Sequence, residues 1–135
     1  MKCSTPEWHQ RLTSTNDILI ERVRGGEPLP DGFILAAHEQ TAGRGRLGRR
    51  WVARPGCSLT FSLLLRGPVV FPTTASLPMA TALGVATALE ALGINVQTKW
   101  PNDLLVCQRK ICGILAERCA REAVVVGVGL NVNMR

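Results

Sequence analysis

No acidic residue occurs between Gln40 and Leu89, although this stretch contains the most basic segment of the chain. Five arginines and three glycines fall within residues 43–54, which begin Gly-Arg-Gly-Arg-Leu-Gly-Arg. Glycine lets backbone amides approach a ligand closely, and the arginine guanidinium matches carboxylate and phosphate groups. Because these arginines have no acidic neighbour in the sequence, we expect a loop that is mobile when empty and ordered by an anionic ligand.

The five cysteines form no CxxC pair, and only two histidines accompany them. A disulfide framework or a zinc site needs such residues at regular spacing, so we expect buried thiols in a reducing compartment and no metal site. The sequence leaves open whether Cys107 and Cys112, on either side of an expected turn, ever pair.

Hydrophobic segments of the kind that direct or anchor proteins at membranes are also missing. The first ten residues contain no apolar run, which argues against a secretory signal. The most apolar long stretch, residues 75–94, contains Pro78 and Glu90 and so predicts a buried helix rather than a membrane span. These absences predict a cytoplasmic protein with no membrane partner.

The remaining composition is that of one folded domain. The chain has 135 residues, of which 46% are hydrophobic and 19% charged, enough to bury a core. Its net charge of +6 is concentrated in one loop, which favours a small anionic ligand over a long polyanion. A nucleic-acid patch is the alternative for this loop, but Trp51 is its only aromatic residue and stacking surfaces usually contain several. We therefore expect no nucleic-acid partner.

The order of helical and extended segments predicts an α+β fold. A cap at Ser14 begins a helix that Gly25 and Gly26 end, and a second helix is expected over residues 76–92. The expected strands cover residues 33–37, 58–65, 95–100, 104–107, 110–117 and 123–132. Short turns at 101–103 and 108–109 indicate antiparallel pairing, so we expect a mixed, largely antiparallel sheet flanked by helices.

Two finer expectations concern the terminus and the second helix. The opening dozen residues are expected to be a loose terminus. The second helix is expected to pack closely on the sheet through one set of spaced residues: Leu77, Ala80, Leu83 or Gly84, Ala88 and Ala91.

Known phosphate-binding loops do not account for the glycine-arginine segment. It satisfies the pattern GxGxxG, but a dinucleotide-binding fold also needs a helix directly after it and an acid about 20 positions on. Arg54-Pro55-Gly56 interrupts the chain instead, and no acid follows before Glu90. A Walker loop would need a Gly-Lys-Ser or Gly-Lys-Thr sequence, which is absent here.

Four other stretches carry candidate functional residues, each with a purely structural alternative. Ser14-Thr15-Asn16 could serve only as a helix cap, and Thr98–Leu104 could be a hairpin turn with Trp100 packed on the core. Lys110, which opens an apolar strand, could be a solvated edge charge. Glycines in the apolar stretch 127–133 indicate close approach of a ligand or of another backbone.

Taken in order, these stretches resemble the catalytic domain of biotin protein ligases. The resemblance runs from about Thr13 to Asn133 and rests on STN, EQTAGRG, GRGRLGR, KWPNDL, KICGIL and GVGLNVN. It implies the fold shared by biotin synthetases and class II aminoacyl-tRNA synthetases. It also implies ATP and biotin as substrates with Mg²⁺, formation of biotinyl-5′-AMP, and acyl transfer to a lysine of a biotin carboxyl carrier protein.

The resemblance assigns roles residue by residue. The catalytic residues it implies are Lys110, Arg46 and Asp103. The biotin-binding residues are Ser14, Thr15, Asn16, Gln40, Gly43, Arg44, Gly45, Arg46, Lys110 and Gly113. The nucleotide-binding residues are Arg44, Arg46, Arg49, Trp51, Asn102, Lys110 and Asn131.

Family catalytic domains continue past the GVGLNVN strand, so we expect residues 1–135 to be one catalytic domain that is incomplete at its C-terminal end. We expect neither an N-terminal DNA-binding domain nor a C-terminal β-barrel domain. Homodimerisation through the sheet, common in the family, is a further expectation. Two alternatives stay open, namely a biotin or biotinyl-adenylate binding module without full turnover, and a lipoate or octanoate ligase.

Overall fold

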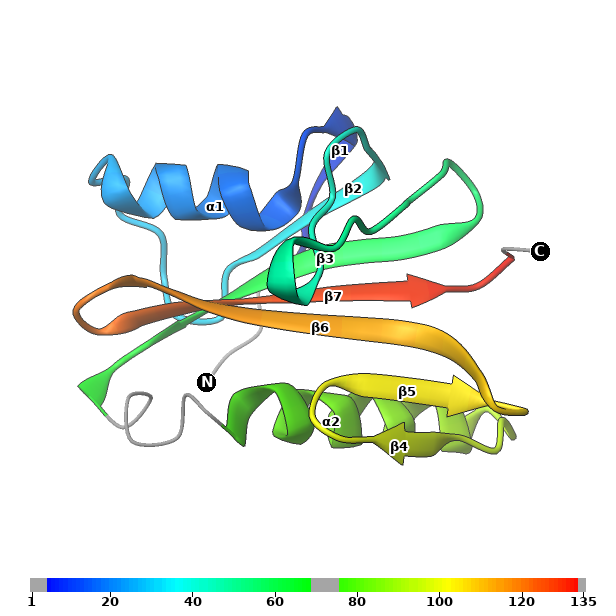
Figure 1. The fold of residues 1–135 in the computed structure, drawn as a ribbon. Helices are drawn as coiled ribbons and strands as arrows, with labels where there is room; N and C mark the ends of the chain where they lie inside the picture. Colours follow the sequence, from blue (N-terminus) through cyan, green and yellow to red (C-terminus); the bar gives the residue numbers. More distant parts are fainter. Residues whose placement is uncertain (1–4, 69–75, 134–135) are drawn as a thin grey trace.

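A computed structural model describes residues 5–68 and 76–133. A helix follows each of the first three strands, and four consecutive strands follow the last helix (Figure 1). Their bounds are β1 Glu7–Leu12, α1 Thr15–Arg24, β2 Ile34–Gln40, the short 3₁₀ helix η1 Arg46–Gly48, β3 Ser58–Arg66, α2 Leu77–Ala91, β4 Gln97–Lys99, β5 Asp103–Val106, β6 Arg109–Ala120 and β7 Ala123–Asn131. Within the described residues, neither helix is long and apolar enough to cross a membrane.

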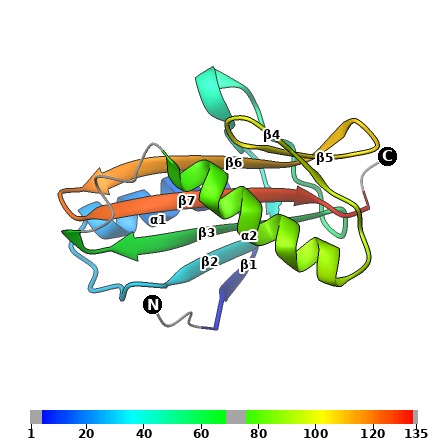
Figure 2. The same cartoon turned by 90° about the horizontal axis from the view of Figure 1, so that it is seen from below.

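The described strands form one seven-stranded sheet in the order β1-β2-β3-β7-β6-β5-β4. β1 and β2 are parallel, and the other neighbouring pairs are antiparallel. Helix α1 covers one face of the sheet and α2 the other, as the two views show (Figures 1 and 2). The expectation of a mixed, largely antiparallel sheet flanked by helices is confirmed.

Strand β1 corrects the expectation of a loose terminus. Its sequence, EWHQRL, is polar and gives no apolar alternation, yet it pairs with β2. Arg22 on α1 donates to Glu7 at 2.7 Å and to Glu27 at 2.8 Å, which ties the strand to the helix. The hydrogen bond from Arg22 also lowers the pKa of Glu7. Backbone pairing and this tether hold the strand at the sheet edge.

Helix α1 forms as its cap predicts. Ser14 is extended, and its Oγ accepts a hydrogen bond from the Asp17 amide at 3.2 Å. Leu19, Ile20 and Val23 are buried on the sheet, and Gly25 follows the last turn. They join a core cluster with Leu29, Leu35, Leu64, Cys119, Ala123 and Val125. This packing fixes the N-terminus of α1 over the middle of the sheet.

Helix α2 occupies the expected residues but packs through a different face. Its buried residues are Ala82, Ala86 and Leu89, whereas Leu83 on the predicted face is 54% exposed. The helix is apolar on nearly every side, so its sequence periodicity does not distinguish the packed face. The buried face joins a second core cluster with β5, β6 and β7, including Val124, Val126 and Val128.

The C-terminal strands form the expected meander with small shifts. The turn between β5 and β6 falls at Cys107 and Gln108, which both have positive φ, one residue before the expected position. Trp100 is 72% exposed rather than packed on the core. The Cys107 and Cys112 thiols are both free.

Alternation along the central strands gives the sheet two different faces. On β7, Val124, Val126 and Val128 face α2, whereas Gly127 and Gly129 lie beneath residues of α1 and of the glycine-arginine loop. One face is therefore a dense apolar core, and the other is left open near the loop.

Candidate active site

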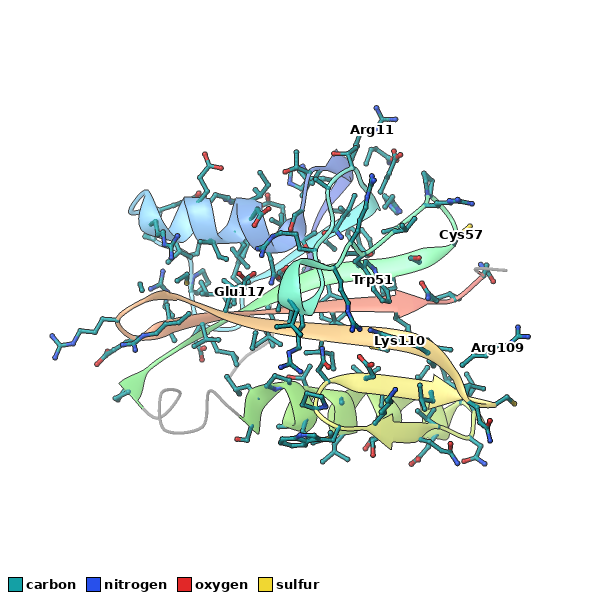
Figure 3. The ribbon with its side chains drawn as sticks, viewed as in Figure 1. Arg11, Trp51, Cys57, Arg109, Lys110 and Glu117 are labelled. Carbon is teal, nitrogen blue, oxygen red and sulfur yellow. The ribbon has the colours of Figure 1, made fainter. Side chains whose placement is uncertain are left out.

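The open part of the sheet is the floor of a cavity of about 450 Å³. Its walls come from the N-terminus of α1, the glycine-arginine loop and the turn before β5. Figure 3 shows Trp51 and Lys110 in this region, with Glu117 farther along β6. The lining includes thirteen of the residues that the sequence predicts for the site: Ser14, Thr15, Asn16, Gln40, Arg44, Gly45, Arg46, Arg49, Trp51, Asn102, Asp103, Lys110 and Gly113.

Buried hydrogen bonds position the first turn of α1 at one end of the cavity. Ser62 Oγ on β3 lies 2.7 Å from Thr15 Oγ1 and 2.5 Å from Asn16 Oδ1. The Thr15 amide donates to Gln40 Oε1 at 2.7 Å. These bonds present the positive end of a helix and several fixed polar groups to a ligand.

Glycines form the cavity floor because larger side chains there would collide with the side chains packed above the sheet. A Cβ at Gly127 would overlap the Asn16 side chain, and one at Gly129 would overlap the Trp51 ring. At Gly113 a Cβ would lie 3.2 Å from the Trp51 ring and 3.3 Å from Lys110. Close approach of other side chains therefore accounts for these glycines, as their place in an apolar strand predicts.

Arg44 bridges the loop to two carboxylates from distant parts of the chain. It pairs with Asp17 on α1 at 2.5 Å and with Glu117 on β6 at 2.7 Å. Hydrogen bonds to Glu117 and Asp17 raise the pKa of Arg44. The expectation that no acid neutralises this arginine is therefore wrong, because it considered only neighbours in sequence.

Two other arginines of the loop keep their charge available. Arg46 and Arg49 line the cavity, and neither has an ion-pair partner among the described residues. Arg46 begins η1 and Arg49 follows it, and between them Leu47 adopts a left-handed conformation with φ of 57°. The loop thus offers two guanidinium groups to an anionic ligand.

Lys110 lines the cavity and contacts Asp103 and Trp51. Its Nζ is 3.0 Å from Asp103 Oδ1 and 5.7 Å from the centre of the Trp51 ring. Asp103 Oδ1 is buried, and the ion pair with the Lys110 ammonium offsets its charge. Lys110 is therefore a paired site residue rather than a solvated edge charge.

Three predicted residues have mainly structural contacts or lie outside the lining. Asn102 lines the cavity, but its Nδ2 donates to the Ile114 carbonyl at 2.8 Å and anchors the turn before β5. Gly43 and Asn131 do not line the cavity. The Gly43 carbonyl accepts from the Trp51 amide at 2.9 Å, and Asn131 Oδ1 accepts from Ser58 Oγ at 3.3 Å.

Sequence reasoning missed two residues that organise the site, Ser62 and Glu117, and one that lines the cavity, Thr60. Ser62 holds Thr15 and Asn16, and Glu117 Oε1 accepts from Asn16 Nδ2 at 3.0 Å as well as from Arg44. The polar positions of the alternating strand 58–65 were the available signal for the two hydroxyls. Nothing in the sequence near Glu117 distinguishes it from a surface acid.

The described residues contain no group of three or more histidine, cysteine or acidic side chains able to hold a metal ion. Magnesium, however, usually binds through one or two carboxylates together with substrate phosphates and water. Asp103, a carboxylate in the cavity lining whose Oδ1 pairs with Lys110 Nζ at 3.0 Å, fits that requirement.

The model of the biotin/lipoate A/B protein ligase family matches residues 8–133. These residues contain every described strand from Trp8 of β1 onward, together with the whole cavity lining. The chain therefore belongs to the biotin/lipoate A/B protein ligase family.

Curated relatives include a bifunctional ligase/repressor BirA from Bacillus subtilis, 37% identical over 95% of this chain and 40% of that protein. A biotin--[acetyl-CoA-carboxylase] ligase from Mycobacterium tuberculosis is 42% identical over 88% of this chain and 46% of that protein. The chain thus spans less than half the length of these relatives.

A similar fold occurs in a solved biotin protein ligase from Aquifex aeolicus in complex with biotin and ATP. The two structures have a TM-score of 0.83 and 38% identity, over 96% of this chain and 53% of the other. The fold is that of biotin protein ligase catalytic domains, as the resemblance implies.

Proposed function

We propose that this chain activates biotin with ATP and transfers the biotinyl group to a lysine of a carrier protein. The observation that carries the proposal is the position of Lys110, which lies between Asp103 and the Trp51 ring in a cavity that the unpaired arginines of the loop also line. Family membership and the biotin and ATP complex of the Aquifex relative support the choice of substrates.

Biotin would be held at the end of the cavity formed by α1. Ser14, Thr15 and Asn16 offer hydroxyl, amide and backbone groups there, and Gln40 is held against Thr15. Because these groups are uncharged, they suit the neutral ring system of biotin. The carboxylate of biotin would then extend towards Lys110 and the loop.

The first chemical step joins two anions, so its main obstacle is electrostatic repulsion. A carboxylate oxygen of biotin attacks the α-phosphorus of ATP, the bond from that phosphorus to the bridging oxygen breaks, and pyrophosphate leaves. Lys110 would contact both the carboxylate and the α-phosphate, because its ammonium is a compact charge that serves two oxygens in turn. Arg46 and Arg49 would neutralise the remaining phosphate charge and retain the acyl-adenylate.

Magnesium, when bound, supplies charge neutralisation for the ATP phosphates. Asp103 is the side chain at the cavity that would hold it. The approach of substrate phosphates would also draw Lys110 away from Asp103, since the lysine then has a second anionic partner.

In the second step, the carrier lysine amine attacks the acyl carbon, and AMP leaves as the amine loses a proton. We propose the biotin carboxyl carrier protein as the acceptor and the cytoplasm as the compartment. We also propose that residues 1–135 act as a catalytic domain whose nucleotide site is completed by further parts of the domain. The chain would form homodimers and use no nucleic-acid or membrane partner.

Replacing Lys110 tests the adenylation site. Lys110→Ala should lower the rate of biotinyl-5′-AMP formation on the order of 10²–10³-fold, as for the loss of one preorganised donor. The fold should be retained, because the lysine is not part of either core cluster. The measurement is mass-spectrometric detection of the adenylate after mixing the protein with biotin, ATP and magnesium.

Arg109→Ala is the matched control for this experiment. Arg109 is the next basic residue on β6, but it is exposed, lies outside the cavity lining and extends away from the sheet (Figure 3). Its loss should leave the rate within about twofold, since it contacts no part of the site. Normal turnover by Lys110→Ala would refute the proposed role of the lysine.

A biotin-binding module without turnover is the second candidate. The chain spans 40% and 46% of the two curated relatives above, so more than half of each relative lies outside the matched region. A rise in melting temperature with biotin, without adenylate formation, would support this candidate. Adenylate formed with lipoate or octanoate but not with biotin would instead support the lipoate branch of the family.

A further inference from the structure

One buried hydroxyl at the cavity has no partner. Thr60 on β3 is 3% exposed, and its Oγ1 makes no hydrogen bond with any described residue. Its neighbours across the sheet are Ala37 on β2 and Gly129 on β7, which have no polar side chain to offer. Burying a hydroxyl without a partner destabilises a folded protein, so this position needs an explanation.

The neighbouring hydroxyls on the same face of β3 are both satisfied. Ser58 donates to Asn131, and Ser62 contacts Thr15 and Asn16. Thr60 lies between them and is the exception in the row. Because valine has the same shape and would pack there without an unsatisfied group, a purely structural role does not explain the threonine.

Thr60 belongs to the lining of the cavity. A second unsatisfied polar atom adjoins the same spot, since Trp51 Nε1 is buried without a hydrogen-bond partner and the Trp51 ring lies over Gly129. A threonine hydroxyl donates or accepts, whereas an indole nitrogen only donates. Two such groups around Gly129 suit a ligand with a hydrogen-bond acceptor at the cavity floor.

We propose that Thr60 is a ligand-contacting residue whose hydroxyl hydrogen-bonds a polar atom of the biotin ring system. The inference rests on the proposed function for the identity of the ligand. It makes Thr60 a specificity determinant, because an apolar ring in the same place would leave the hydroxyl and the indole nitrogen unsatisfied. A dithiolane ring, as in lipoate, is such a ligand.

The test measures biotin affinity and the melting temperature of the free protein. Loss of a ligand contact lowers the affinity, whereas loss of a structural hydroxyl lowers the melting temperature. In Thr60→Val, biotin affinity measured by titration calorimetry should fall about tenfold, the effect of losing one buried hydrogen bond. The melting temperature of the free protein should stay the same or rise, because an unsatisfied group has been removed. Thr60→Ser, which keeps the hydroxyl, should retain biotin affinity within about twofold.

Ser62→Ala is the matched control. Its hydroxyl has partners in the free protein, so its removal should lower the melting temperature. The inference fails if Thr60→Val binds biotin as tightly as the unchanged protein, or if its melting temperature falls as far as that of Ser62→Ala. Absence of biotin binding by the unchanged protein would instead overturn the proposed function, and the inference with it.

Discussion

Gly127 shows how one missing side chain can organise a site. Asn16 occupies the space above it, and that asparagine holds Ser62, Glu117 and the Leu115 carbonyl by hydrogen bonds. The glycine does not serve to allow an unusual backbone angle, since its φ is not in the left-handed region. Its role is to leave room for the Asn16 amide.

Gly127→Ala should therefore displace Asn16. We expect a loss of about 1–3 kcal/mol in the free energy of unfolding, the usual cost of inserting a methyl group into a packed site. Biotin affinity should fall at least tenfold, because the first turn of α1 loses its anchor. Thermal denaturation and calorimetric titration would measure the two effects.

Gly84→Ala provides the control, because nothing lies within 4 Å of a Cβ at that exposed helical position. It should stabilise the protein by about 0.5–1 kcal/mol, the difference in helix propensity, and leave biotin affinity unchanged. Equal effects of the two substitutions on stability and biotin affinity would show that the position of Asn16 does not depend on a glycine at position 127.

Individual site residues could be predicted where they belong to short motifs. Lys110, Arg46 and the Ser14–Asn16 group lie in such motifs, and the structure brings them to one cavity. Ser62 and Glu117 could not be predicted, because their importance depends on which strands become neighbours. The sequence around a serine or glutamate in a strand does not indicate which strands will lie next to it.

At the scale of elements, the glycine-arginine loop is held by the Arg44 ion pairs. Asp17 is on α1 and Glu117 is on β6, so the loop is fastened both to the helix and to the sheet. Glu117 also accepts a hydrogen bond from Asn16, which connects loop order with the α1 end of the site.

Glu117→Gln should loosen the loop in the free protein. The amide keeps an oxygen for Asn16 but loses the charge that attracts Arg44. An ion pair of this exposure contributes up to about 1 kcal/mol, so tryptic cleavage after Arg46, Arg49 and Arg50 should accelerate roughly fivefold. Cleavage fragments can be followed over time by mass spectrometry.

Glu39→Gln removes an exposed ion pair, with Arg11 at 2.8 Å, and so serves as the control. It should not change cleavage in the loop, because neither residue lines the cavity. Identical cleavage of the Glu117 and Glu39 variants would mean that the Arg44 ion pairs do not restrain the loop.

Most elements could be predicted from caps, alternation and turns, but two features could not. Strand β1 has no apolar pattern and exists because β2 offers an edge and Arg22 a partner for Glu7. The packed face of α2 is not encoded by amphipathicity, because apolar residues surround the helix. Both features depend on contacts between distant segments.

The whole molecule combines two cores on opposite faces of one sheet, and buried thiols lie in each. Cys112 belongs to the α2 side and Cys119 to the α1 side. Burial raises the pKa of Cys112 to about 12 and also raises that of Cys119. Both thiols therefore stay protonated in the folded protein at pH values where the unfolded chain would ionise.

The raised pKa values of the buried thiols make the folded protein less stable at alkaline pH. When the pKa of a thiol is raised in the folded state, its stability contribution is fully present below the unfolded-state pKa of about 9. That contribution is lost as the pH rises towards the pKa in the folded state. For Cys112 the loss at pH 11 should be about 2.5 kcal/mol. Urea unfolding between pH 8 and 11 should show a decline that is smaller in Cys112→Ala.

Cys107→Ala is the control for this pH dependence, because Cys107 is exposed. It should show the same decline as the unchanged protein. A Cys112→Ala variant whose stability falls just as steeply would place the alkaline sensitivity elsewhere in the molecule.

The fold class could be predicted at this scale, but the strand order could not. Short turns indicate that β4 to β7 are consecutive neighbours, and the sheet does place β7-β6-β5-β4 together. The pairing of β3 with β7 joins segments that are far apart in the sequence. No local sequence pattern predicts the pairing of β3 with β7, because any strand with one apolar face could pair with the same edge of β3.

That pairing also has a consequence for biosynthesis. The first turn of α1 and the arginine loop are translated long before β6 and β7, which supply Glu117 and the glycine floor. At roughly 5–20 residues per second, a ribosome delivers Gly129 several seconds after Asn16. A nascent chain therefore has no cavity for ligand until β7 has emerged, and a small molecule that binds there can act only after that strand has been made.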